Sequence, residues 1–222
     1  MDRKRIEDLL GRELAQKDHN FLEYNIPRED ILSSLRDRSR QFYLIVAPRG
    51  SGKSGLLLML QDELKRLSGA SSTVLLKYYE DVQFPETEMP IDTSMQYWIE
   101  KILRWIVAEI GTQIEIPETG DEIFAVELAE QLGLRETDFE PAACRSRDAS
   151  VERLRPVTKR LIDRTGRTFW LLLDEMDDSY SNTPARNHAL VGLLQACDAV
   201  SKLSDKIVVR LTIRPHIHTY LG

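Results

Sequence analysis

Four runs of apolar residues stand out along the chain. They are nearly continuous rather than alternating with polar residues, a pattern that is typical of strands covered on both faces, as in parallel sheets. Four buried strands are therefore expected. The runs occupy residues 41–48, 72–81, 168–178 and 206–215.

The segments between these runs carry apolar residues at helical spacing. Leucines in 53–67 recur three and four positions apart, and 93–111 and 185–203 show the same period. Two further helical patterns, 1–16 and 28–40, precede the first run. Because strands alternate with helices, the sequence predicts an α/β fold, a three-layer α/β/α sandwich around a parallel sheet.

The stretch from 113 to 150 interrupts this alternation, and we interpret it as a helical insertion. Residues 113–144 hold many acidic side chains against the single Arg135, whereas 145–167 is dominated by arginine and lysine. The two charged arms could be solvated faces or could pair between subunits, and the basic arm could contact nucleic acid.

The composition is that of an ordinary globular domain, with 222 residues, 42% hydrophobic content and a net charge of -6. We assign 41–222 to the core and 1–40 to an N-terminal helical segment. No run approaches the roughly 18 apolar residues of a membrane span, and the charged N-terminus lacks a secretory signal. A cytoplasmic protein without a membrane partner is expected. Cys144 and Cys197 show no metal-ligand spacing, so both should be reduced.

The turn after the first apolar run contains the most specific motif. Residues 47–54, APRGSGKS, match G-x-x-x-x-G-K-[ST] except that Ala47 replaces the first glycine. Between a strand and a helix, such a loop curls its N–H groups around phosphate oxygens, and the helix N-terminus adds positive charge. Lys53 would reach the β- and γ-phosphates, and Ser54 would bind Mg²⁺. The alternative is a glycine-rich turn with a surface lysine. The residues expected around the phosphates are Pro48, Arg49, Gly50, Ser51, Gly52, Lys53, Ser54 and Gly55.

An acidic motif ends the third apolar run, where FWLLLDE leads into Asp174 and Glu175. An aspartate in this position can hold Mg²⁺, and the following glutamate can act as general base on the attacking water. The alternative is a polar strand end before a helix cap. We interpret Asp177 and Asp178 as turn formers ahead of the next helix.

Together the two motifs resemble the P-loop NTPases of the additional-strand, catalytic-glutamate division, and within it the AAA+ and STAND-like or KAP-like groups. The resemblance also rests on the upstream box YNIPRED and on VVRLTIRP, and covers most of residues 22–216. It implies MgATP as ligand and a place for Tyr24 and Ile26 in the adenine pocket. Packing of these two residues in the core is the alternative.

The same resemblance implies a polar sensor at the end of the fourth strand. Alternation puts Arg210, Thr212 and Arg214 on one side of that strand. Thr212 is therefore the candidate sensor, and Arg214 a candidate phosphate-sensing or inter-subunit arginine.

The general base has two candidates in the sequence. The resemblance places the strand that ends in Asp174 beside the strand before the loop, which favours Glu175. Carboxylates at the end of the second strand, Glu80 and Asp81, are the alternative.

We predict a domain that binds and hydrolyses ATP and couples this cycle to conformational change or assembly, as a homo-oligomer or with an effector protein. The resemblance implies bacterial signalling or defence. No guanine-reading [NT]-K-x-D segment is present, which favours ATP over GTP. The fifth strand and helical lid that the resemblance implies are not found before Gly222, so a fragment is expected. The alternatives are a slow nucleotide-gated switch or scaffold and a P-loop small-molecule kinase.

Overall fold

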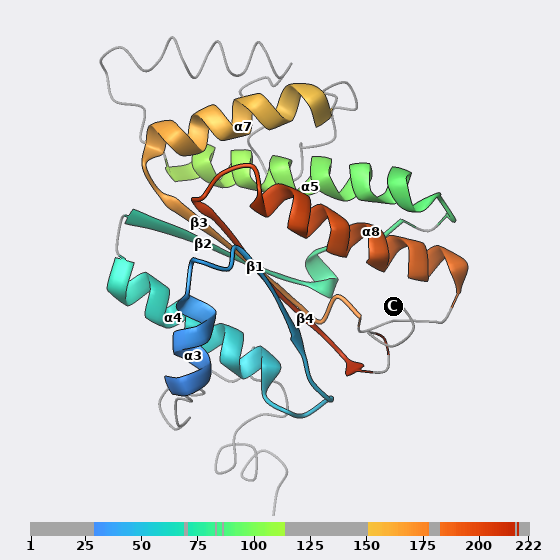
Figure 1. Ribbon diagram of the computed structural model, residues 1–222, viewed down its shortest axis with the longest axis horizontal. Helices are drawn as coiled ribbons and strands as arrows, with labels where there is room; N and C mark the ends of the chain where they lie inside the picture. Colours follow the sequence, from blue (N-terminus) through green and yellow to red (C-terminus); the bar gives the residue numbers. More distant parts are fainter. Residues whose placement is uncertain are drawn as a thin grey trace, which may run out of the picture.

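Each of the four apolar runs forms a strand in the computed structural model (Figure 1). The structure describes residues 29–68, 71–82, 84–85, 87–113, 151–177, 183–215 and 217. In chain order the elements are α3 (Glu29–Arg36), β1 (Phe42–Val46), α4 (Lys53–Ser68), β2 (Ser72–Tyr78), the 3-10 helix η3 (Tyr79–Asp81), α5 (Ile91–Gln113), α7 (Val151–Thr165), β3 (Thr168–Asp174), α8 (Pro184–Ser201) and β4 (Ile207–Ile213). The fold is α/β, as the alternation of patterns predicted.

The strands form one sheet in the order β1-β4-β3-β2, and every neighbouring pair is parallel. β4 therefore separates β3 from β1, and the expectation that the strand ending in Asp174 lies beside the strand before the loop is wrong. An apolar pattern identifies a buried strand but carries no information about its neighbours. In register, Ile45 pairs with Thr212 and Tyr78 with Asp174.

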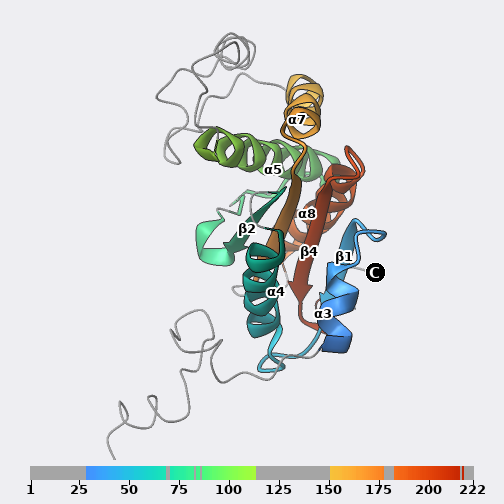
Figure 2. The same cartoon turned by 90° about the vertical axis from the view of Figure 1, so that its left-hand side faces the viewer.

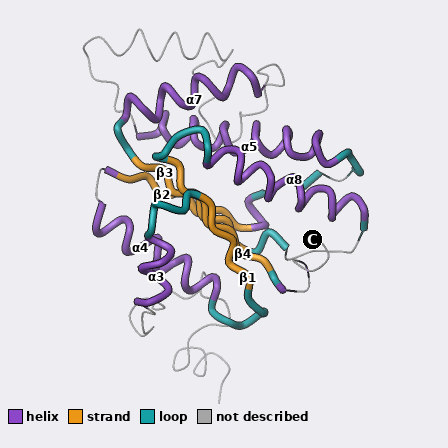
Figure 3. Tube along the Cα trace, in the orientation of Figure 1, coloured by secondary structure: helices purple, strands orange, loops and turns teal. Residues whose placement is uncertain are grey.

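This strand order determines where the helices lie. The chain crosses from β1 to the far edge at β2 and then returns through β3 to β4. Because crossovers between parallel strands are right-handed, the outward and the returning connections must use opposite faces of the sheet. Figure 3 shows α3 and α4 on one side of the sheet and α5, α7 and α8 on the other, and Figure 2 gives the view turned by 90°.

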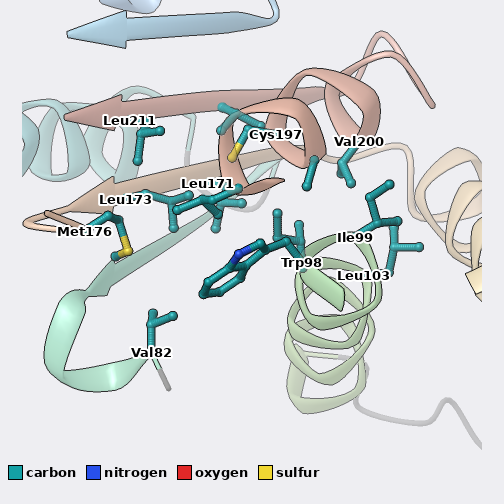
Figure 4. Packing of buried hydrophobic residues seen from close by; sticks show 14 of the residues in the cluster. Val82, Trp98, Ile99, Leu103, Leu171, Leu173, Met176, Cys197, Val200 and Leu211 are labelled. Carbon is teal, nitrogen blue, oxygen red and sulfur yellow. The ribbon is translucent and has the colours of Figure 1, made fainter. Parts of the chain in front are cut away.

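Each face of the sheet has its own apolar cluster. We name the side under α3 and α4 the α4 face and the opposite side the α5 face. On the α4 face, leucines of both helices pack on Trp170, Leu172 and Val208. The α5 face buries the larger cluster, in which Trp98 of α5 lies against side chains of β3 and α8 (Figure 4). The sheet is therefore covered on both faces, which explains its continuous apolar runs.

Two strands end earlier than their apolar runs. β2 stops at Tyr78 because the Asp81 carboxylate accepts a hydrogen bond from the Tyr78 N–H (3.0 Å) and folds the chain into η3. β3 stops at Asp174 because Glu175 has a φ of 57°. The Asp81 side chain thus determines the end of β2, and the left-handed backbone of Glu175 determines the end of β3.

Helix α7 was missed from the sequence. Leu154, Thr158 and Ile162 recur at every fourth position and are buried, so the helical period was present in this segment. Pro156 inside the helix and the dense positive charge concealed it, because proline normally interrupts a helix.

Several sequence expectations lie outside the described residues. They concern the helical pattern at 1–16, the adenine-pocket candidates Tyr24 and Ile26, most of the insertion at 113–150, and Asp178. Cys197 is a free, buried cysteine, and burial raises the pKa of its thiol. None of the described helices combines the length and apolarity needed to cross a bilayer.

Candidate functional site

The glycine-rich loop joins the carboxyl end of β1 to the first turn of α4. Gly50 and Gly52 have φ values of 77° and 86°, which only glycine adopts at little cost. A Cβ atom at either glycine would meet nothing within 4 Å, so the backbone conformation, not space, requires glycine. The Ala47 N–H donates to the Ile213 carbonyl (3.2 Å), which ties the loop to the end of β4.

Lys53 is the first residue of α4 and folds back over the loop. Its Nζ donates to the carbonyls of Ala47 (2.7 Å) and Pro48 (2.8 Å). Burial lowers the pKa of Lys53, and the carboxylates of Asp177, Asp174 and Glu175 oppose that shift. The ammonium group therefore lies at the loop, within electrostatic reach of the acidic residues that follow β3.

Asp174 occupies the carboxyl end of β3 and is fully buried. Its Oδ1 accepts from the Thr212 hydroxyl (2.5 Å) and from the Glu175 N–H (3.0 Å). Its Oδ2 is buried and has no hydrogen-bond partner among the described residues. Because buried polar atoms nearly always have partners, and this one is a carboxylate oxygen at the end of a strand, we take it as a candidate ligand-binding position among the described residues.

Glu175 turns the chain out of the sheet in the left-handed region, at a φ of 57°. Such a conformation costs a non-glycine residue about 1–3 kcal/mol and is found preferentially at functional sites. Its N–H also lies 3.4 Å from the Thr212 hydroxyl. Asp174 and Thr212 together therefore hold the backbone from which the Glu175 side chain projects.

Thr212, the candidate sensor, contacts the acidic motif through Asp174. Arg210 lies on the same α4 face but serves a different purpose. Its guanidinium stacks over Trp170, at 5.3 Å from the ring centroid. It donates to the carbonyls of Leu35, Asp37, Arg40, Gln41 and Val209. Arg210 therefore fastens α3 and the start of β1 to the sheet.

Arg214 directly follows β4, and Asp177 holds it. Asp177 is 3% exposed, and its Oδ2 accepts from the Arg214 N–H at 2.7 Å and lies 3.8 Å from Arg214 Nε. Asp177 does lie in a turn, as predicted, but its side chain is a buried link to Arg214. Sequence reasoning missed this link because nothing in the pattern showed where the acidic turn and the end of β4 meet.

Tyr78 is a second residue that sequence reasoning missed. It ends β2 opposite Asp174 in register. Burial, followed by the charges of Asp174, Glu175 and Asp81, raises the pKa of Tyr78 to about 12. The phenol therefore stays protonated beside the acidic motif at neutral pH. A large polar aromatic residue ending an apolar run was the available signal.

The two alternative bases, Glu80 and Asp81, lie in η3, directly after β2. Asp81 is exposed, and its carboxylate is engaged with the Tyr78 N–H in the local turn. Glu80 lies in η3, and its side chain is outside the described part of the structure.

The loop, the acidic motif and the residues after β4 all lie at the carboxyl ends of parallel strands. From this edge the chain leaves β1 toward α4 on one face and leaves β3 toward α8 on the other. Open α/β sheets bind ligands at such switch points. Within the described ranges, no group of three or more His, Cys, Asp or Glu side chains could hold a metal ion. Comparison with protein-family models, curated proteins and solved structures found no match to this chain.

Proposed function

We propose that this chain is a P-loop domain that binds and hydrolyses ATP and couples the cycle to conformational change or assembly. The observation that carries the proposal is the buried, unpartnered Oδ2 of Asp174, at the sheet edge that also bears the glycine-rich loop and Lys53. A loop that presents N–H groups, a lysine and a buried carboxylate form a combination suited to a phosphate chain with its metal ion. The finer fold, a P-loop α/β/α sandwich of the AAA+ and STAND-like or KAP-like kind, belongs to the same proposal.

The residues present fit Mg²⁺. Mg²⁺ prefers oxygen ligands and in nucleotide sites takes one or two protein groups, with water and phosphate oxygens completing its shell. Asp174 offers a buried oxygen without a partner, and Ser54 offers a hydroxyl in the first turn of α4. When bound, Mg²⁺ would supply positive charge that neutralises the charge developing on the phosphate chain.

The chain's own residues then have distinct tasks. The loop N–H groups and the N-terminus of α4 would bind the phosphates, and Lys53 would exchange its two carbonyl partners for phosphate oxygens. Thr212 fixes Asp174 through its hydroxyl. Glu175, projected from a strained backbone, would take the proton of the attacking water.

Isothermal titration with MgATP tests the binding half of this proposal. Lys53→Ala should weaken ATP binding at least tenfold, about 1.4 kcal/mol, because a charge-assisted contact to phosphate is lost. Lys202→Ala is the matched control, since Lys202 is an exposed lysine paired with Asp198 at the C-cap of α8. Equal ATP affinity of wild type and Lys53→Ala would contradict the proposal.

A homo-oligomer or an effector protein is the partner that a coupled ATPase requires, and both remain proposals. Contact of the basic segment 145–167 with nucleic acid is a further proposal, and the described part of this segment, residues 151–167, contains all of α7. Sedimentation at low and high salt tests for a homo-oligomer, and sedimentation with and without DNA tests for contact with nucleic acid. Contacts driven by charge should weaken at high salt because ions screen them.

A further inference from the structure

The link between Asp177 and Arg214 joins two turns that are distant in sequence. Asp177 follows β3 and Arg214 follows β4, yet one carboxylate oxygen lies 2.7 Å from the Arg214 N–H and 3.8 Å from its Nε. The same oxygen therefore fixes the main chain of Arg214 and faces its guanidinium. A buried carboxylate placed in this way pre-organises an arginine, because it limits both the backbone and the side chain.

Arg214 lies at the rim of the glycine-rich loop. The residue before it, Ile213, accepts a hydrogen bond from Ala47, the first residue of the loop. Burial lowers the pKa of Lys53, the charge of Asp177 opposes that shift, and the charge of Arg214 adds to it to a smaller extent. Lys53 thus binds the loop directly, and Arg214 lies next to the residue that the loop contacts. Asp177 binds Arg214, and its charge also acts on Lys53.

We infer that Asp177 is a positioning residue, which holds Arg214 against the terminal phosphate of a nucleotide bound to the loop and so gives the site its preference for ATP over ADP. This inference rests on the proposed function. Arginine recognises phosphate through the fixed geometry of its N–H groups, so its orientation decides how much of that contact is realised. ADP lacks the terminal phosphate and would be little affected by the orientation of Arg214.

The test measures the dissociation constants of MgATP and MgADP for the full chain by isothermal titration. Asp177→Asn keeps an oxygen that can accept from the Arg214 N–H but removes the charge that faces the guanidinium. Its ratio of ADP to ATP dissociation constants should fall roughly tenfold, with ADP affinity nearly unchanged. Asp198→Asn makes the same replacement at an exposed carboxylate and should leave the ratio at the wild-type value.

Arg214→Ala provides a second variant that does not depend on the folding of Asp177→Asn. It should lose the same preference for ATP, and the double variant should lose no more than either single variant, since both act on one contact. Thermal unfolding distinguishes positioning from a structural role, because the main-chain hydrogen bond to Asp177 persists in Arg214→Ala. Asp177→Ala should therefore still lower the melting temperature in the Arg214→Ala background, but by less than in wild type, because the contact with the guanidinium is already absent there.

Three outcomes would overturn the inference. One is an unchanged ATP preference in Arg214→Ala, and another is a changed stability but unchanged preference in Asp177→Asn. The third is tighter binding of both nucleotides to Asp177→Asn, which would make Asp177 a competing counter-ion. If Lys53→Ala bound both nucleotides like wild type in the same assay, the proposed function itself would fail.

Discussion

The two faces of the sheet differ in what they bury. On the α5 face, three helices enclose a large apolar cluster whose members reach from α5 and α7 to α8. On the α4 face, two helices cover a smaller cluster into which β3 and β4 place Asp174, Arg210 and Thr212, all fully buried. The α5 face is thus an apolar core, whereas the α4 face combines a smaller core with buried polar and charged groups in fixed positions.

Burial of the Arg210 charge on the α4 face is possible because backbone carbonyls accept its hydrogen bonds, whereas Asp174 is bound through only one of its two oxygens in the described part of the chain. Arg210 donates to five carbonyl oxygens, and Thr212 and the Glu175 N–H share one oxygen of Asp174. Desolvation nevertheless lowers the pKa of Arg210 to about 10, which means that burial disfavours the charged form of this side chain. The comparison predicts that substitutions at the carboxyl end of β3 change chemistry, whereas substitutions of Arg210 and of residues on the α5 face change stability.

The largest effect is expected at Glu175. Glu175→Gln keeps the shape of the side chain but withdraws the base, so ATP should still bind while hydrolysis falls about 10²–10⁴-fold. Steady-state release of phosphate measures this loss. Glu80→Gln is the control and should have much less effect. A larger loss in Glu80→Gln than in Glu175→Gln would move the base to the end of β2. If neither substitution changed the rate of hydrolysis while ATP still bound, the nucleotide-gated switch would be favoured.

Arg210→Met tests whether the buried cation on the α4 face stabilises the fold. Methionine can replace the stacking on Trp170 but leaves several carbonyls without their donor, so unfolding should become easier by about 3 kcal/mol. Chemical denaturation measures the change. Stability equal to wild type would mean that water or a local shift satisfies these carbonyls, and would remove the assigned role of Arg210.

Prediction from the sequence was reliable wherever a local pattern determined the outcome. The four apolar runs, the leucine spacing of α4 and the loop that begins at Ala47 are of this kind, because burial on both faces and glycine conformations leave direct traces in the residues. Strand order and the meeting of Asp177 with Arg214 depend on contacts between distant segments. Such contacts have no local trace, so the sequence could not place β4 between β1 and β3.

Gly192→Ala examines the close packing of the α5 face. A Cβ at Gly192 would lie 2.4 Å from the Ser94 Oγ and 2.8 Å from the Met95 backbone nitrogen. Because backbone cannot give way as a side chain does, α5 and α8 must move apart, at about 1–3 kcal/mol. Thermal unfolding measures this cost, and Ala189→Gly, on the same helix and without the clash, is the comparison. An unchanged melting temperature for Gly192→Ala would show that the helices separate freely.

The smallest effect is expected from Lys101 on α5. Burial lowers the pKa of Lys101 from 10.5 to about 8, and its Nζ donates to the Tyr97 hydroxyl. Between about pH 8 and 10.5 the unfolded chain binds more protons at this position than the folded chain, so the lysine makes stability rise with pH. Denaturation at several pH values should show a weaker rise in Lys101→Met. Identical slopes would contradict the shift.

The central place of β4 has a consequence for the order of events during synthesis. β1 leaves the ribosome first, yet its neighbour in the sheet begins only at Ile207. Until then β1 lacks the strand with which it pairs, the carbonyls of Leu35 and Arg40 lack the Arg210 donor, and the nascent chain carries an open strand edge. Pairing across such long separations is slow, so this interval is when the growing chain is most exposed to misassociation and to chaperones.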